Sequence, residues 1–375
     1  MKPTLRRRIA SAVSLLTAVA LVAAVAPPAT AAPAPRLTPA VRSYTAPVRI
    51  APNGCSPALL VFDGTGRGHG FTTCPQAAYI EGAGSSWKVV KGADQGIPAS
   101  VADDGVNTYA LFSNGFGVLR LLIRSRATGR LTVKVLSTTY YGGPNEATVI
   151  GRGGRWWAVW GVSDGGCACN QLWTARTMLT PYSAHRTTLI GANPYLANRG
   201  SSAILTWSQG YTWGGSVAVG YPTTSGFTQS RPGFAGIFPS VSVAGGTLRL
   251  TYQTGFNHVV YQQLVNGHWS GHTFTRTLTY RSAQAYGIFH RPVPIVVSGS
   301  VVRLGWSTPH SSTVHATVVA KRVGSTWTET LVSDGLTSPL GNDLASMGMA
   351  GSQTVLVITH VTSNPNTTFD VVRRG

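Results

Sequence analysis

The sequence predicts an all-β fold built from one repeated unit. Short, strongly apolar segments recur along the chain, and each follows a shorter apolar segment and a glycine-bearing turn. No amphipathic helix is evident after Ala32, and 44 glycines separate the segments. With 43% hydrophobic residues, the chain is long and apolar enough to form a large core.

The repeat has two parts that align from unit to unit. The first is the start of an innermost strand, at Pro98, Glu146, Pro194, Pro239, Pro292 and Leu344. The second is a longer apolar strand: TYALFS, RWWAVWG, SAILTWS, TLRLTYQ, VVRLGWS and TVLVITH. The six starts lie 45 to 53 residues apart. This period predicts a single β-propeller, in which four-stranded blades stack around an axis.

The clearest unit runs from Asn145 to Thr187. We expect strands at Ala147–Ile150, Arg155–Gly161 and Asn170–Thr177, and a weaker one near Ser183–Thr187. The second of these, RWWAVWG, carries large apolar side chains on both faces. This pattern predicts a sheet packed between two other sheets.

The number of blades depends on the two ends of the chain. Three strands precede the first full unit, at Ala58–Asp63, Gln76–Glu81 and Ser86–Lys91, and one follows the last, at Thr367–Arg373. We predict seven four-stranded blades, closed by pairing of the N- and C-terminal strands through a segment within Val41–Ile50. The alternative is six blades, with the N-terminal strands as an appendage.

The N-terminus predicts export. Basic residues precede an uncharged apolar run from Ile9 to Val25, and Ala29-Thr30-Ala31 fits a cleavage site. We assign residues 1–31 to a signal peptide, 32–40 to a linker and 41–375 to the propeller. The alternative, a membrane anchor, requires a run of about 20 residues, and Pro27 and Pro28 end this one early. We therefore expect a secreted protein, either free or associated with the cell wall, with no transmembrane segment after signal removal. Arg6-Arg7 also permits a twin-arginine route.

The chain is strongly basic. Its formal charge is +19, and +15 remains after residues 1–31 are removed, carried almost wholly by arginines that are scattered singly. Such a charge attracts anionic polymers at long range, but scattered cations form no specific nucleic-acid surface. The partners that we expect are an extracellular glycan or an anionic cell-surface polymer, with the protein itself a monomer.

The four cysteines suggest one ordinary disulfide. In an exported chain Cys55, Cys74, Cys167 and Cys169 would be oxidised, and three pairings are possible. We favour Cys55–Cys74, which would tie the start of the first hairpin to its partner strand. Cys167 and Cys169 would then close a small strained ring or stay reduced. The cysteine and histidine spacings offer no metal site, and nothing indicates a cofactor.

The repeat pattern resembles that of secreted bacterial propellers of the sialidase-like and glycan-hydrolase type. The resemblance covers nearly the whole mature chain, but it rests on period and strand pattern. The Asp boxes of sialidases, Ser-x-Asp-x-Gly-x-x-Trp, are absent, and no family residue is carried over.

Three acidic residues occupy equivalent positions in the loops that enter innermost strands: Asp94, Glu146 and Asp343. Carboxylates from separate blades could supply the acid and base of glycoside hydrolysis. Glu146 would be the acid, with a raised pKa, and Asp94 and Asp343 the base and modulator. The alternative is that these side chains satisfy backbone donors at strand starts.

Ligand-binding candidates belong to the same predicted face, where the entering loops and the loops between second and third strands would surround the channel mouth. Aromatic rings there would stack on sugars, and polar side chains would orient them. The candidates are Arg67, His69, Phe116, Asn193, Tyr211, Trp213, Phe256, Asn257, Arg291 and His310. Two main hypotheses follow, a carbohydrate-binding propeller and a glycoside hydrolase, with a wall-associated scaffold as a third; whether the protein is an enzyme stays open at this point.

Overall fold

A computed structural model confirms an all-β propeller fold. It describes residues 38–39, 44–114, 117–140, 145–163, 170–210, 215–230, 232–255, 258–275, 292–309, 315–332, 342–360 and 368–375. Within these ranges every regular element is a strand, and no helix long and apolar enough to cross a membrane occurs.

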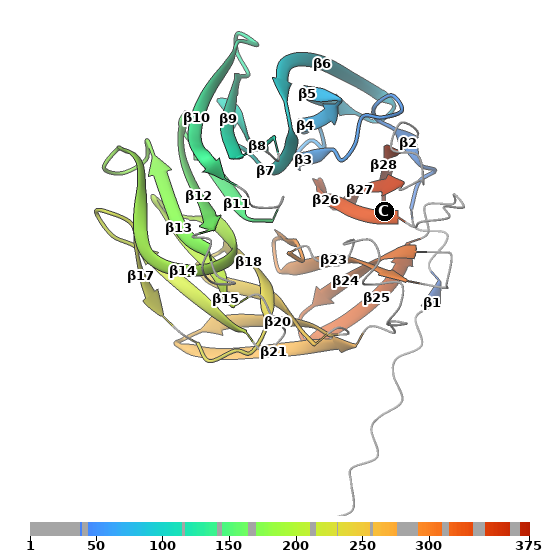
Figure 1. The fold of residues 1–375 in the computed structure, drawn as a ribbon. Coiled ribbons are helices and arrows are strands. Elements are labelled where there is room, and N and C mark those ends of the chain that lie inside the picture. The colour runs from blue at the N-terminus through green and yellow to red at the C-terminus, as the bar shows by residue number, and fades with distance from the viewer. Residues whose placement is uncertain are drawn as a thin grey trace, which may run out of the picture. The chain divides into compact units, whose positions relative to one another are not determined.

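Hydrogen bonds join the described strands into six sheets, arranged around a common centre (Figure 1). Three of them follow the chain in order with four strands each. The first holds β3 (Leu59–Phe62), β4 (Gly68–Cys74), β5 (Gln76–Ala83) and β6 (Ser86–Gln95). The second holds β7 (Ile97–Asp103), β8 (Asn107–Ser113), β9 (Gly117–Ser125) and β10 (Leu131–Tyr140). The third holds β18 (Ile237–Ala244), β19 (Thr247–Thr254), β20 (His258–Val265) and β21 (His268–Thr275).

A seven-stranded sheet contains two of the predicted units. Its strands are β11 (Ala147–Arg152), β12 (Arg155–Ser163), β13 (Asn170–Arg176), β14 (Tyr182–Arg199), β15 (Ser202–Gln209), β16 (Ser216–Pro222) and β17 (Phe227–Ser230). The first half of β14 pairs with β13 and the second half with β15. The expectation of separate four-stranded sheets is wrong here, because the chain continues in extended conformation from the outer strand of one unit into the innermost strand of the next.

The chain ends complete the two remaining sheets. One holds β22 (Ile295–Ser298), β23 (Val301–Pro309), β24 (His315–Val323) and β25 (Thr326–Val332), with β1 (Thr38–Pro39) added parallel to β25. The other holds β26 (Asn342–Ala350), β27 (Gln353–His360), β28 (Phe369–Arg374) and β2 (Val48–Arg49). Because β2 pairs antiparallel with β28, the N- and C-terminal segments of the described fold share one sheet.

The first sheet contains a strand that the sequence did not reveal. The predicted strands near Ala58–Asp63, Gln76–Glu81 and Ser86–Lys91 are β3, β5 and β6, but β4 lies between the first two. Its sequence, GHGFTTC, is poor in branched apolar residues. Gly70 has a packing reason, because a Cβ there would collide with the Leu59 carbonyl of β3.

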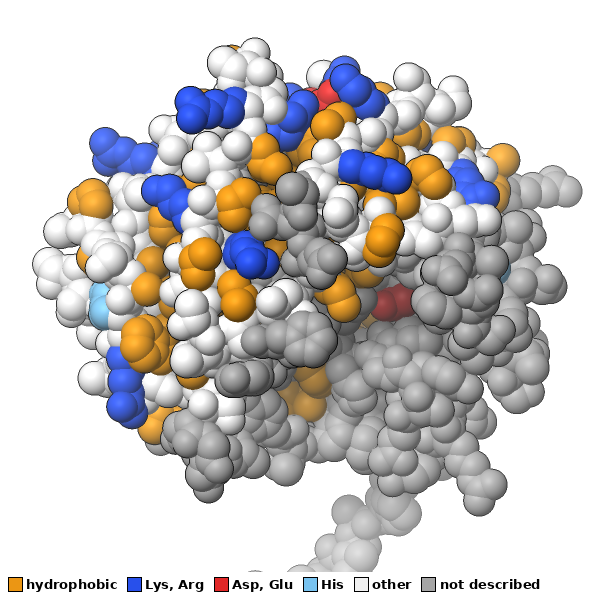
Figure 2. Space-filling model, turned by 45° about the horizontal axis from the view of Figure 1, so that its top comes forward, with side chains coloured by type: hydrophobic (Ala, Val, Ile, Leu, Met, Phe, Trp, Pro, Cys, Tyr) orange, Lys and Arg blue, Asp and Glu red, His pale blue; other side chains and the backbone are white. Residues whose placement is uncertain are grey.

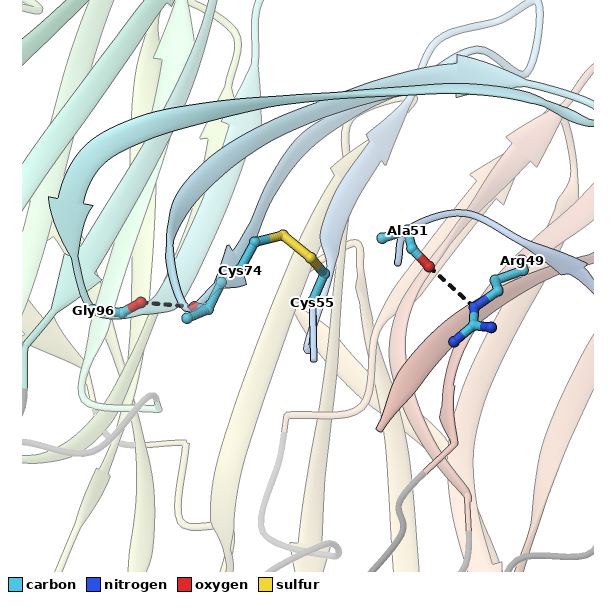
Figure 3. The surroundings of a disulfide bond; sticks show 6 residues. Arg49, Ala51, Cys55, Cys74 and Gly96 are labelled. Atoms are coloured by element: carbon cyan, nitrogen blue, oxygen red, sulfur yellow. Dashed lines mark hydrogen bonds between the residues drawn. A yellow bond between two sulfur atoms is a disulfide. The ribbon is translucent and has the colours of Figure 1, made fainter. Parts of the chain in front are cut away.

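The predicted disulfide is present. Cys55 bonds to Cys74, the last residue of β4, and links the segment before β3 to this strand (Figure 3). Next to it, the Thr73 hydroxyl donates to the Gly96 carbonyl at 2.7 Å, and Arg49 Nε donates to the Ala51 carbonyl at 3.2 Å. Cys167 and Cys169 lie outside the described residues.

The apolar second strand of each unit is buried on both faces, as predicted. In β12, Trp157 and Trp160 are fully buried, and Trp207 of β15 is buried in the same way. The RWWAVWG side chains divide between two clusters, one with the β7–β10 sheet and the other with β14 to β17. Packing between neighbouring sheets therefore forms the core.

Contacts between innermost strands follow one another in a ring. They run from β3 to β7, β11, β14, β18, β22 and β26, and from β26 back to β3. These strands do not pair with one another. Instead, a hydroxyl on one innermost strand accepts the backbone N–H of the next in three places: Ser100 from Val149 (3.1 Å), Thr148 from Leu196 (3.1 Å) and Ser346 from Leu60 (2.9 Å).

The three hydroxyl residues occupy the same place in the repeat, two positions after Pro98, Glu146 and Leu344. Ser208 of β15 and Ser307 of β23, the last residues of SAILTWS and VVRLGWS, accept in the same way from Phe238 and Leu344. Register shifts in β14, β18 and β26 lie next to the donors Leu196, Phe238 and Leu344. Hydroxyl groups therefore satisfy backbone donors that strand pairing leaves over.

We predict that Thr148→Val lowers the free energy of unfolding by about 1 to 3 kcal/mol, because the buried Leu196 N–H loses its acceptor. Thr148→Ser keeps the hydroxyl and should therefore retain most of the wild-type free energy of unfolding. Thr132→Val, at an exposed position of β10, is the control, and its effect should stay within about 0.5 kcal/mol. Denaturant unfolding measures all three; equal values for Thr148→Val and Thr132→Val would contradict the role of the hydroxyl.

Candidate ligand-binding site

A cavity of about 500 Å³ lies between the innermost strands. Residues of β3, β7, β11, β14, β22 and β26 line it, together with Asn145 before β11 and Pro292 and Pro294 before β22. Most of its lining is apolar, for example Pro98, Pro194, Ile295 and Met347, and no described lining residue is charged. The cavity therefore suits a neutral ligand, because an unpaired charge would be costly to bury there.

Glu146 lies just before β11 and is buried, with 8% of its surface exposed. Its Oε2 accepts hydrogen bonds from Asn170 Nδ2 (3.0 Å) and from the backbone N–H of Asn193 (3.2 Å). Its Oε1 accepts one from Asn193 Nδ2 (3.0 Å). Burial raises the pKa of Glu146 to about 7, while the bonds from Asn193 and Asn170 act in the opposite direction.

Asn193 extends this network across neighbouring units. Its Oδ1 accepts from the Ser208 hydroxyl (3.3 Å), whose oxygen accepts the Phe238 N–H (3.1 Å). Asn193 and Phe238 both have a positive φ, +52° and +51°, and each precedes a proline of the repeat. Since residues other than glycine rarely adopt this conformation, the bonds of Glu146 and Ser208 help to hold Asn193 and Phe238 in it.

The other two predicted acids are less fully described. Asp343 is buried, and its Oδ1 accepts from the Ser307 hydroxyl (3.0 Å), which also accepts the Leu344 N–H. Asp94 lies in β6, and its side chain is outside the description. Glu146 thus accepts a backbone N–H at the start of an innermost strand, whereas Asp343 accepts from the hydroxyl that binds the Leu344 N–H. A catalytic role for the three acids stays a prediction.

Most of the predicted ligand-binding residues lie outside the described part of the chain. These are Phe116, Tyr211, Trp213, Phe256, Asn257, Arg291 and His310. Asn193 is described, but it is buried and its side chain bonds to Glu146 and Ser208. The ligand contacts expected of these residues stay predictions.

The expected placement of Arg67 and His69 is wrong. Because β4 follows β3, Arg67 lies in the turn between the first and second strands, and His69 lies at the beginning of β4. Antiparallel alternation puts this turn at the edge opposite to the loops that enter innermost strands. The two residues are therefore not at the predicted channel mouth with Glu146.

They belong instead to a charged cluster at the opposite edge, which the sequence did not reveal. Arg126 joins the first two sheets, since its Nη1 pairs with Asp103 at 3.1 Å and its Nη2 lies 3.8 Å from Asp63. Arg67 pairs with Glu81 at 3.6 Å. The sequence signal was weak, because these residues come from turns of two different units.

His69 is buried at the centre of this cluster, with 2% of its surface exposed. Arg126 Nη2 lies 2.9 Å from His69 Nε2, so Nε2 accepts and Nδ1 carries the proton that it donates to the Tyr79 oxygen (3.1 Å). Tyr79 in turn donates to Glu81 (3.1 Å). Burial, assisted by Arg126, lowers the pKa of His69. This pairing and burial indicate a structural contact between the first two sheets.

Comparison with known proteins supports the fold alone. No protein-family model matches the chain, and no curated protein matches it. Among solved structures, the β-propeller domain of Cps50 (Swd1) from Myceliophthora thermophila is similar at 9% identity, with a TM-score of 0.55, over 88% of this chain and 99% of that one. This likeness agrees with the propeller architecture.

Two other similar structures are a lectin and a putative lactonase. The Aleuria aurantia lectin, in complex with Fucα1-6GlcNAc, is 12% identical, with a TM-score of 0.46, over 70% of this chain and 87% of that one. A putative 6-phosphogluconolactonase from Bacteroides uniformis is 12% identical, with a TM-score of 0.47, over 84% of this chain and 94% of that one. The sialidase-like type that the repeat pattern implied stays a prediction.

We predict that Glu146 makes the protein less stable as pH rises from 4.5 toward 7. The folded state holds the proton more tightly than the unfolded state, so this contribution is fully favourable below pH 4.5 and is lost as pH rises through about 7. The full change is on the order of 3 kcal/mol. Glu146→Gln removes it, so the stability difference between wild type and variant should shift over this range in denaturant unfolding. A difference that is constant with pH would contradict the assignment.

Proposed function

We propose that the protein is a secreted, non-enzymatic propeller that binds a carbohydrate at the end of the central cavity where the innermost strands begin. The observation that carries the proposal is the cavity itself, about 500 Å³ in volume and without a charged side chain among its described lining residues. Ligand pockets in proteins have this size and are mostly apolar. A sugar offers apolar C–H faces to such a lining and keeps its hydroxyl groups toward polar side chains at the rim.

The strand order supports this end of the cavity as the binding face. Asn145, which lines the cavity, precedes the innermost strand β11. The segments 115–116, 211–214 and 256–257 connect second to third strands, between β8 and β9, β15 and β16, and β19 and β20. Antiparallel alternation brings those strand ends to the edge where innermost strands begin. We propose that Trp213 and its aromatic neighbours in these segments stack on the sugar.

The alternative, a glycoside hydrolase, draws on one observation. A pKa of about 7 for Glu146 suits a general acid near neutral pH. However, both carboxyl oxygens of Glu146 accept hydrogen bonds, one of them from a backbone N–H. These bonds hold Asn193 in its unusual backbone conformation, so they favour a structural role for Glu146 and binding rather than hydrolysis.

The finer architecture is part of the same proposal. We propose that the chain acts as seven units around the axis, because seven innermost strands contact one another in succession. The seven-stranded sheet then counts as two units that share β14. We further propose that residues 1–31 direct export and that the protein acts outside the cell as a monomer.

We predict that Trp213→Ala weakens glycan binding by about tenfold, the loss typical of an aromatic residue at the centre of a binding surface. Trp213→Phe, which keeps a ring, should bind nearly as wild type. A glycan panel measures binding, and hydrolysis is assayed on the same panel. If the wild-type protein hydrolyses a glycan and Glu146→Gln abolishes this hydrolysis while the fold stays intact, the proposal is contradicted and the hydrolase is supported. Binding that Trp213→Ala leaves unchanged would contradict the site.

A further inference from the structure

A groove separates the outer strand β10 from the sheet that begins with β11. Two hollows, of about 430 and about 330 Å³, lie along it and share Val135 and Leu136 of β10 as lining residues. Strands β12, β13 and the beginning of β14 form the other wall. The groove shares no lining residue with the central cavity.

One wall of the groove contains a buried arginine. Arg176, on β13, is only 1% exposed and lines the larger hollow. Its Nε donates to the Thr180 carbonyl (2.9 Å), and its Nη2 donates to the carbonyls of Thr223 (3.2 Å) and Thr224 (2.7 Å). The guanidinium lies 4.2 Å from the ring centre of Trp157 and 4.3 Å from that of Tyr182. Its position is therefore closely defined.

The charge of Arg176 is not balanced within the described structure. All three of its acceptors are neutral carbonyls, no described carboxylate forms an ion pair with it, and its Nη1 has no hydrogen-bond partner there. A buried donor without a partner is unusual in a native fold. It is the first indication that an acceptor from outside the chain completes this site.

A second cation faces the same hollow from the opposite wall. Lys134 of β10 is exposed and lines the hollow, with its Nζ 5.9 Å from the ring centre of Trp156. No acidic residue is among the described lining residues of either hollow. The described lining residues of the groove thus include two cations and no acidic residue. Figure 2 shows Lys and Arg side chains spread among hydrophobic ones over one face of the molecule.

Aromatic side chains give the groove a second property. Trp156 and Tyr182 line the larger hollow, and Trp173 lines the smaller one. Trp173 and Tyr182 are only partly buried, so part of each ring faces the groove or solvent. Aromatic faces pack on the C–H faces of sugars, whereas the cations pair with an acidic substituent.

We propose that this groove binds an acidic polysaccharide, with a uronate carboxylate near Lys134 and Arg176 and neighbouring sugar rings along β10. The site goes beyond the proposed function, because it is separate from the central cavity and selects for charge. The carboxylate supplies the acceptor that Arg176 Nη1 lacks, after a small movement of the Tyr182 ring that covers the guanidinium. The two hollows accommodate adjacent sugars of one chain.

The test compares polygalacturonate oligomers with neutral oligosaccharides of the same length, using the whole protein and calorimetry. Wild type should bind the acidic oligomer at least about tenfold more tightly than the neutral one. Lys134→Gln should weaken that binding by about fivefold, as expected for one charge-assisted contact. Lys88→Gln removes the same charge from an exposed site on β6, the outer strand of another sheet, and should have little effect.

Arg176→Lys is a second variant, since it keeps the charge but loses the planar fork, and circular dichroism checks its fold. It should reduce binding of the acidic oligomer at least as much as Lys134→Gln. Equal losses in Lys134→Gln and Lys88→Gln would overturn the proposal and assign binding to net charge. Preference for a sulfated polymer over the uronate would also overturn it. Trp213→Ala should leave this binding unchanged, so failure here and failure of the cavity site are distinguishable.

Discussion

The structure depends on how the innermost strands meet without pairing. Around the axis of a propeller the sheets converge, and strand edges leave backbone N–H groups that no neighbouring strand can accept. In this chain, hydroxyl groups two positions after the start of an innermost strand accept them, as Thr148 does for Leu196. Because an unsatisfied buried N–H is expensive, these short polar residues stabilise the fold together with the tryptophans between the sheets.

The same constraint shapes the central cavity. Lining hydroxyl groups such as that of Thr148 are bonded to the backbone, and most of the remaining lining residues are apolar. Glu146 illustrates this effect, since a residue of the type needed for catalysis is held by Asn170 and Asn193 instead. A neutral cavity with its polar groups already satisfied favours recognition over bond cleavage. The groove along β10 is different, because there a buried charge lacks its acceptor.

Much of the fold could be predicted from the sequence because burial on two faces leaves a strong local pattern. RWWAVWG and its equivalents predicted their strands correctly for this reason. By contrast, β4 was missed because it lacks a run of branched apolar residues. Its Gly70 is explained by a close backbone contact rather than by apolar burial. This one missed strand also misplaced Arg67 and His69, because it reversed the edge to which their turn belongs.

The candidate site was predicted only in part. The repeat placed Glu146 and Asn193 at equivalent positions of successive units, but it did not predict that they bond to each other or that Asn170 also binds Glu146. The Arg176 groove needs residues of β10 and β13 to line the same hollows, which no local pattern predicts. Each of these sites depends on contacts between units, whereas the sequence pattern describes single units.

Amide hydrogen exchange at Leu60, Val149 and Leu196 tests the central claim most directly. If neighbouring hydroxyl groups accept these N–H groups, all three should exchange as slowly as the paired amides of the buried second strands. Thr148→Val should then speed exchange at Leu196 and leave Leu60 slow. Fast exchange at all three amides in the wild-type protein would contradict the claim that these bonds hold the innermost strands together.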